Sequence, residues 1–155
     1  MAQNLLIFSK NCVILKTEKP LEIHFKCLEV KTMGKFVIKQ TKSGYVFNLK
    51  AGNGEVIATS QVYSSVAGCS NGCASVSRNA PEANLEDQTV EGFATEKHPK
   101  FEVYTDNAGE FRFRLKATNG EIIATSEGYK SKASCLNGVE SVRKNSEHAP
   151  VAMEE

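Results

Sequence analysis

The chain has 155 residues, of which 41% are hydrophobic and 24% are charged, and its formal net charge is +1. This length suits one compact domain or two very small ones, and the composition is ordinary for a soluble globular protein, which argues against a disordered or fibrous chain. The nearly balanced charge differs from the strongly basic balance that is typical of nucleic-acid-binding proteins.

Residues 1–33 are expected to be an N-terminal extension that is not part of the main fold. Their apolar pieces, Leu5–Phe8, Cys12–Leu15 and Leu21–Phe25, are strand-like, but no recognised type of hairpin turn joins them. A hairpin added at a sheet edge is the alternative. These pieces lack the features of a signal peptide, and no apolar run in the chain approaches the ~20 residues of a membrane-spanning helix. We therefore expect a cytoplasmic protein without membrane contact.

From residue 34 onward the chain consists of two copies of one unit. Tyr45–Asn79 aligns with Phe111–Asn145, and more than half of the aligned residues are identical. The predicted domains are a first repeat at residues 34–90, a linker at residues 91–99 and a second repeat at residues 100–155. Such clear self-similarity indicates that both copies adopt the same local fold.

Each copy is predicted to begin with three β-strands. In the middle strand of the second copy, apolar residues alternate with basic ones: Phe111, Phe113 and Leu115 with Arg112, Arg114 and Lys116. This alternation is typical of a strand with one buried face. Asn119-Gly120, like Asn53-Gly54 in the first copy, predicts a hairpin to the third strand because both residues tolerate positive φ.

An amphipathic helix is predicted after the third strand of each copy. Ser65 and Ser131 suit the N-cap position, because a serine hydroxyl can accept a hydrogen bond from the first free helical N–H groups. Each helix also contains an interior Asn-Gly pair, Asn71-Gly72 and Asn137-Gly138. Since an interior glycine costs about 1 kcal/mol relative to alanine, we expect the helix backbone to lie close to the sheet at these glycines.

A set of short motifs in the second copy carries a family resemblance. The motifs are Asn119-Gly120-Glu121, Ser126-Glu127, Tyr129, Ser131-Lys132-Ala133 and Asn137–Val142. Over residues 34 to about 153 the chain resembles the YegP-like family of small bacterial repeat domains. The resemblance implies an α+β fold, in which two tandem β3-α-β repeats form one antiparallel sheet with both helices packed on one face.

The resemblance further implies that the last strand of each repeat, near Asn84–Asp87 and Val151–Met153, is swapped into the other repeat. Two copies in one chain can satisfy this exchange internally, and we therefore expect a monomer. The family has no established activity, so the resemblance assigns no catalytic or cofactor-binding residue.

The five cysteines, Cys12, Cys27, Cys69, Cys73 and Cys135, are expected to be reduced thiols, because an odd number in a chain of this size argues against a disulfide framework. Cys69 and Cys73 stand four residues apart on a predicted helix and could face one metal ion. Zinc normally takes four ligands, however, and no second pair is visible. The second copy has Cys135 and Val139 at the equivalent positions. We therefore interpret both as core residues and predict no metal and no cofactor.

Chemistry-bearing residues are otherwise sparse. His24, His98 and His148 stand outside any catalytic or metal motif, and the chain contains no phosphate-binding loop, dinucleotide fingerprint or nucleophile elbow. The sequence favours a non-catalytic binding or accessory module over an enzyme. The main alternative is a cryptic thiol-dependent enzyme that uses Cys69.

The outward residues of the middle strands form a candidate basic surface patch, made of Arg112, Arg114, Lys116 and Lys50. Together with Asn48 and nearby Tyr63 or Tyr129, such a face could follow a phosphate backbone and stack a base. The alternative is that these charges only solvate an outward face, with Glu110 and Glu121 diluting their field. We favour this second interpretation and expect any nucleic-acid binding to be weak.

Overall fold

The computed structural model describes residues 6–9, 12–15, 26–27 and 33–155, and the chain divides into two units, Met1–Met33 and Gly34–Glu155. In the first unit, β1 (Leu6–Ser9), β2 (Cys12–Leu15) and β3 (Lys26–Cys27) form a sheet in the order β1-β2-β3. The first two strands pair antiparallel. The predicted strand-like segment at residues 21–25 lies outside the described residues.

The second unit contains both repeats, and each has three strands, a helix and one more short strand. The first repeat comprises β4 (Lys35–Thr41), β5 (Gly44–Lys50), β6 (Val56–Thr59), α1 (Val66–Asn79), the short 3-10 helix η1 (Ala80–Glu82) and β7 (Asn84–Asp87). The second comprises β8 (Lys100–Thr105), β9 (Phe111–Lys116), β10 (Ile122–Thr125), α2 (Lys132–Ser146) and β11 (Val151–Met153). The predicted α+β class and the two repeats are confirmed.

These strands form one sheet in the order β11-β4-β5-β6-β10-β9-β8-β7. The last strand of each repeat pairs with the first strand of the other repeat, and both of these pairs are parallel. The sheet is therefore mixed, and the expectation of a purely antiparallel sheet is corrected. Hairpins reverse the chain between neighbouring strands, whereas a helix leads into β7 and into β11. Residues 88–99 provide the long return that two parallel neighbours such as β7 and β8 require.

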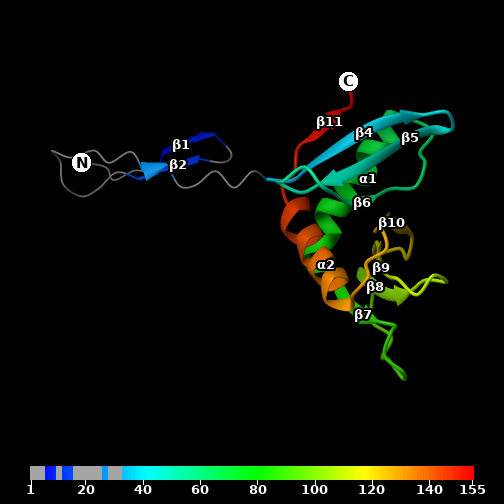
Figure 1. The fold of residues 1–155 in the computed structure, drawn as a ribbon. Coiled ribbons are helices and arrows are strands. Elements are labelled where there is room, and N and C mark those ends of the chain that lie inside the picture. Colours follow the sequence, from blue (N-terminus) through cyan, green and yellow to red (C-terminus); the bar gives the residue numbers. More distant parts are fainter. Residues whose placement is uncertain (1–5, 10–11, 16–25, 28–32) are drawn as a thin grey trace. The chain divides into compact units, whose positions relative to one another are not determined.

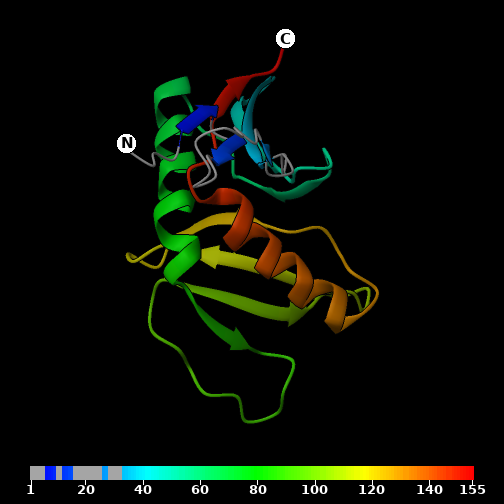
Figure 2. The same cartoon turned by 90° about the vertical axis from the view of Figure 1, so that its left-hand side faces the viewer.

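Both helices lie on the same side of the sheet (Figure 1 and Figure 2). Ser65 and Ser131 cap them as predicted, since the Ser65 hydroxyl accepts from the Gly68 N–H at 3.0 Å and the Ser131 hydroxyl from the Ser134 N–H at 3.1 Å. Helix α2 packs on β5 and β6 of the first repeat as well as on β9 of its own. Helix α1 likewise packs on β10 of the second repeat, so each helix helps to join the two halves of the sheet.

The core lies between the sheet and the helices and is built alike in both repeats. Its large, fully buried residues on the sheet are Phe36, Ile38, Phe47, Leu49, Phe101, Val103, Phe113 and Leu115. A Cβ added at Gly138 would lie 2.5 Å from the Tyr129 hydroxyl and 2.9 Å from the Phe113 ring, and Gly72 is equally close to Tyr63. The predicted close approach of the helix backbone to the sheet at these glycines is confirmed.

None of the helices in the described part of the chain is long and apolar enough to cross a membrane.

Candidate functional site

The described cysteines lie in the core. Cys69, Cys73 and Cys135 are fully buried, which confirms the prediction for the first two. Burial raises the pKa of Cys73 to about 12 and that of Cys135 to about 11, and it also raises the pKa of Cys69. A reactive thiol needs an accessible thiolate with a lowered pKa, and these three thiols have the opposite properties. The side chains of Cys12 and Cys27 lie outside the described part of the structure.

Metal-binding chemistry finds no support in the part of the chain that the structure describes, because no three His, Cys, Asp or Glu side chains gather there in a way that could hold an ion. His98 and His148 are both exposed, and His24 lies outside the described residues. The only ion-pair contact of these histidines in the described part is a distant one, with the His148 Nε2 atom 3.8 Å from the Glu147 Oε1 atom.

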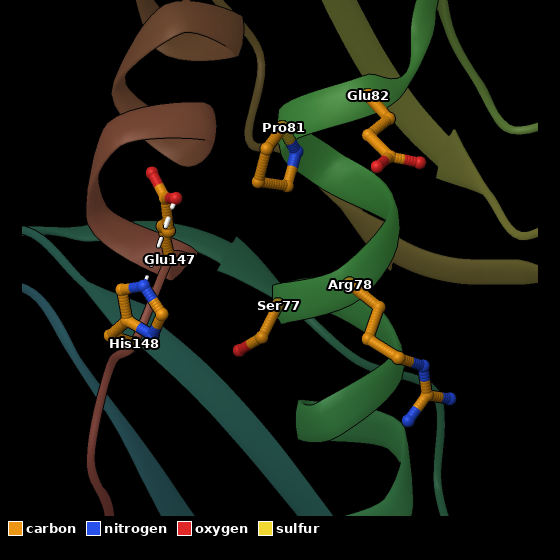
Figure 3. A pocket seen from close by; sticks show the side chains of 6 residues that line it. All are labelled: Ser77, Arg78, Pro81, Glu82, Glu147 and His148. Atoms are coloured by element: carbon orange, nitrogen blue, oxygen red, sulfur yellow. Dashed lines mark ion pairs between the residues drawn. The ribbon is translucent and has the colours of Figure 1, made fainter.

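An open pocket of about 540 Å³ lies where α1, η1 and the end of α2 meet. It is lined by Ser77, Arg78, Pro81, Glu82, Glu147 and His148 (Figure 3). Below it, the Ser77 hydroxyl donates to the Ser146 carbonyl at 2.8 Å, and the Arg143 guanidinium reaches the Ala80 carbonyl at 3.4 Å. These bonds tie the helix ends together. In Figure 3 the Arg78 side chain points away from Glu147 and His148, so the charged groups do not converge on one ligand position.

The three basic residues of the candidate patch that belong to the second repeat lie on the sheet face opposite the helices, here called the outer face. All three are paired with acids. The Arg112 Nε atom is 2.6 Å from Asp106, the Lys116 Nζ atom is 2.9 Å from Glu102, and the Arg114 guanidinium also contacts Glu102. Their field is therefore largely neutralised by Asp106 and Glu102. Glu110 and Glu121, which the sequence singled out, make no ion pair in the described part of the chain.

Glu102 belongs to a larger set of charges, here called the repeat 2 network: Glu86, Lys100, Glu102, Arg114 and Lys116. Glu86, Lys100 and Glu102 are at most 5% exposed. The Lys100 Nζ atom lies between the two carboxylates, 2.6 Å from Glu86 and 3.3 Å from Glu102. The Glu96 backbone N–H also donates to Glu86, at 2.7 Å. The loop after β7 therefore helps to enclose these charges.

The pKa values of the network follow from these contacts. Burial alone would raise the pKa of Glu86, but hydrogen bonds from Lys100, Gln88 and the Glu96 N–H outweigh it and lower that pKa to about 2. Burial opposes ionisation of Glu102 too, yet its basic partners hold its pKa below the ordinary value. Hydrogen bonding to Glu86 raises the pKa of Lys100. All three groups are therefore ionised at neutral pH.

The first repeat carries the same pair of lysines without the acids. Lys35 lies opposite Lys50 in the sheet, as Lys100 lies opposite Lys116. Where the second repeat has Glu102 and Glu86 side by side, the first has Val37 and Ala152. Among the described residues, no acidic side chain lies within ion-pair distance of Lys35 or Lys50, here called the repeat 1 lysine pair.

The four residues of the candidate patch therefore do not form one surface. Lys50 is on β5, and two strands, β6 and β10, separate that strand from β9 and its three basic residues.

Tyr63 and Tyr129, proposed as base-stacking residues, lie on the helix side, where Tyr63 stacks on Phe47 and Tyr129 on Phe113 at centroid distances of 6.4 and 6.3 Å. On the outer face, Tyr104 contacts Arg114 instead, with the guanidinium carbon 4.8 Å from the ring centre. Sequence reasoning missed Glu86, Lys100, Glu102 and Tyr104. Glu102 could have been recognised, because the hairpin at Asp106–Gly109 places it opposite Arg114.

Comparison with known proteins gives consistent matches. A family model described as a domain of unknown function, DUF1508, matches residues 41–87 and 106–152. The UPF0339 protein YegP of Yersinia pestis is 39% identical over 73% of this chain and 88% of its own. A UPF0339 protein from the region 5′ of the ptx operon in Stutzerimonas stutzeri is 73% identical, but the match spans 29% of this chain and 40% of that protein.

A solved structure shows the same fold. The solution NMR structure of YegP from E. coli, itself a protein of unknown function, superposes with a TM-score of 0.65 at 32% sequence identity. The superposition covers 79% of this chain and 94% of that protein.

Proposed function

The chain belongs to the UPF0339 (YegP) family of DUF1508 proteins, and from this premise we propose that it is a non-catalytic binding module. One observation carries the proposal. The two repeats share most of their interior residues, yet their outer sheet faces differ in charge: repeat 2 pairs its lysines with Glu86 and Glu102, whereas no described acidic side chain pairs with the two lysines of repeat 1. In repeat 1, Lys35 is exposed and Lys50 is half-buried, so a partner can reach them, and the outer face of repeat 1 is the proposed binding surface.

The alternative of a thiol-dependent enzyme has less support. The described thiols are buried and have raised pKa values, which disfavours the thiolate that such chemistry requires. Nucleic-acid binding by the predicted patch also has less support, because its three basic residues on β9 already form ion pairs with Asp106 and Glu102. A surface that tracks phosphates needs several available cations.

The proposed module is a cytoplasmic monomer. Support for the monomer comes from the sheet, in which each repeat supplies the edge strand of the other within one chain. Support for the cytoplasm comes from the five cysteines, an odd number that suits a reducing compartment. Sedimentation velocity at several protein concentrations tests the oligomeric state.

The binding role can be tested without knowing the ligand. An isotope-labelled sample of the full chain is placed in an unlabelled bacterial lysate, and the two-dimensional amide NMR spectrum is compared with that in buffer. The proposal expects line broadening concentrated in β4 and β5, with the outer face of β8 and β9 as the internal control. Unchanged spectra, or broadening spread evenly over the chain, would count against a binding surface at this place.

A companion experiment addresses the enzyme alternative. In a Cys12→Ser/Cys27→Ser background, the three core thiols are titrated with a thiol-specific reagent under native conditions. Slow labelling that requires unfolding is expected. Rapid labelling of Cys69 in the folded protein would favour thiol chemistry over the proposed role.

A further inference from the structure

The two lysines of the repeat 1 lysine pair repel each other, and no acidic side chain among the described residues neutralises them. Lys35 and Lys50 lie directly opposite each other in the antiparallel ladder of β4 and β5. Like charges at directly opposite positions destabilise a sheet. Lys39, further along β4, already has an acidic partner, since its Nζ atom is 3.8 Å from Glu154. This corner of the sheet therefore carries a positive charge that an external anion can neutralise.

The second repeat shows what kind of group resolves this conflict. There the equivalent lysines, Lys100 and Lys116, are 3.3 and 2.9 Å from the same Glu102 carboxylate oxygen. A second carboxylate, that of Glu86 on the edge strand, contacts Lys100 from the other side. The strand registers place Val37 and Ala152 where these two glutamates stand. Repeat 2 thus shows how a carboxylate binds between two lysines in this arrangement.

We propose that the outer face of repeat 1 binds an acidic peptide segment of a partner protein, with a Glu or Asp carboxylate seated over Val37 between Lys35 and Lys50. This inference rests on the proposed function and names the chemistry of its ligand. In the complex, the partner's carboxylate takes the place that Glu102 occupies in repeat 2. The aliphatic stems of the lysines and the side chain of Val46 on β5 offer apolar contact beside the charged groups.

A peptide fits this surface better than a nucleic acid does. The outward positions of β4 and β5, which include Lys35, Val37, Lys39, Val46, Asn48 and Lys50, carry no aromatic side chain. Single-stranded nucleic acids are held by aromatic stacking combined with a row of cations. Two adjacent lysines match one or two carboxylates, and they provide only a short stretch of the charge that a phosphate backbone requires.

The test measures binding of a fluorescent peptide of alternating glutamate and serine to the full chain by anisotropy. The same peptide with glutamine in place of glutamate is the ligand control. Substitutions Lys35→Gln and Lys50→Gln are combined in one variant, and Lys42→Gln, in the exposed turn between β4 and β5, is the protein control. Circular dichroism establishes that each variant is folded.

The proposal predicts that the glutamate peptide binds at low salt and that binding weakens at about 0.3 M salt, where charges are strongly screened. The double variant is expected to bind about tenfold more weakly, the combined effect of two exposed ion pairs. The Lys42→Gln variant should bind like the parent. Amide shifts on binding should map to Lys35–Ile38 and Val46–Lys50.

Three outcomes would overturn the proposal: equal affinity of the double variant and the parent, equal affinity for the glutamate and glutamine peptides, or tighter binding of a single-stranded oligonucleotide at the same site. If, in any of these cases, the NMR spectrum in lysate still shows line broadening in β4 and β5, the binding role survives and only the proposed ligand class is wrong. If neither experiment shows binding, the proposed function itself fails.

Discussion

Removal of the Lys100 ammonium is expected to be among the most damaging single changes to the second repeat. The substitution Lys100→Met keeps an aliphatic stem of similar length and deletes the charge between Glu86 and Glu102. Glu102 keeps Arg114 and Lys116 as partners, whereas Glu86 loses the one cation that pairs with it among the described residues and keeps the neutral donors Gln88 and the Glu96 N–H. A carboxylate that is 2% exposed is then left without a counter-charge.

The size of the effect follows from the burial. Breaking a buried ion pair by deleting one partner typically costs 3–5 kcal/mol, and we expect a loss of about 3 kcal/mol because Glu86 retains its hydrogen bonds from Gln88 and the Glu96 N–H. Urea unfolding with linear extrapolation at neutral pH measures it. The matched control is Lys100→Met combined with Glu86→Gln, which removes both charges and retains an acceptor for the Glu96 N–H. This double variant should recover at least half of the loss.

The pH dependence gives a second readout of the same substitution. In the parent, hydrogen bonds from Lys100, Gln88 and the Glu96 N–H lower the pKa of Glu86 from its ordinary value of 4.5 to about 2. Its contribution to stability is therefore complete above pH 4.5 and declines as the pH falls from 4.5 toward 2. In the Lys100→Met variant, Glu86 can become protonated at higher pH, so the stability gap between variant and parent should narrow as the pH falls. A loss below about 1 kcal/mol at neutral pH, the magnitude of an exposed pair, together with no recovery in the double variant, would refute the reasoning.

Three further predictions concern packing and boundaries. Gly138→Ala should destabilise the fold by about 1–3 kcal/mol through overpacking against Tyr129 and Phe113. The control Gly68→Ala, where an added Cβ would lie 3.2 Å from the Ser65 hydroxyl, should be nearly neutral in the same urea assay. Equal losses of stability in both variants would contradict the close approach of the helix to the sheet at Gly138. Cys73→Val should change stability by less than about 1.5 kcal/mol, as volume-conserving core exchanges do, because the second repeat has Val139 there; stoichiometric zinc in the parent that this substitution abolishes would contradict it. A shortened protein that begins at Met33 should unfold with the same free energy as the full chain, since residues 1–33 are proposed to lie outside the main fold; precipitation or a marked loss of stability would move that boundary.

Much of the fold could be predicted from the sequence because each local sequence pattern occurs in both repeats. The alternation around Phe113 and the Asn-Gly turns specify strands and hairpins, and Ser65 and Ser131 mark the helix starts. Even the tight contact at Gly138 could be predicted, since a helix retains an unfavourable interior glycine in both copies only where the backbone needs the space. These features are local, and short-range physical chemistry determines them.

The candidate site was less predictable because it depends on strand pairing over long distances. The pairing of Glu102 with Arg114 follows from the local β8–β9 hairpin and could have been predicted, whereas the burial of Glu86 requires that β7 pairs with β8 in parallel. That parallel pairing is not visible in hydrophobic periodicity. The sequence pattern also gave no indication of the side on which Tyr63 and Tyr129 lie, because both follow the third strand in a short segment without clear alternation.

The most direct test of the central claim is to give repeat 1 the acids that repeat 2 already has. The variant Val37→Glu/Ala152→Glu places two carboxylates beside the repeat 1 lysine pair, and Val37→Gln/Ala152→Gln is its uncharged control of nearly the same size. The measurement is the affinity of the full chain for the glutamate and serine peptide. We predict binding at least about tenfold weaker for the glutamate variant, a change of ~1.4 kcal/mol, and an affinity close to that of the parent for the glutamine variant. Unchanged binding by the glutamate variant would contradict the claim that Lys35 and Lys50 are the binding site.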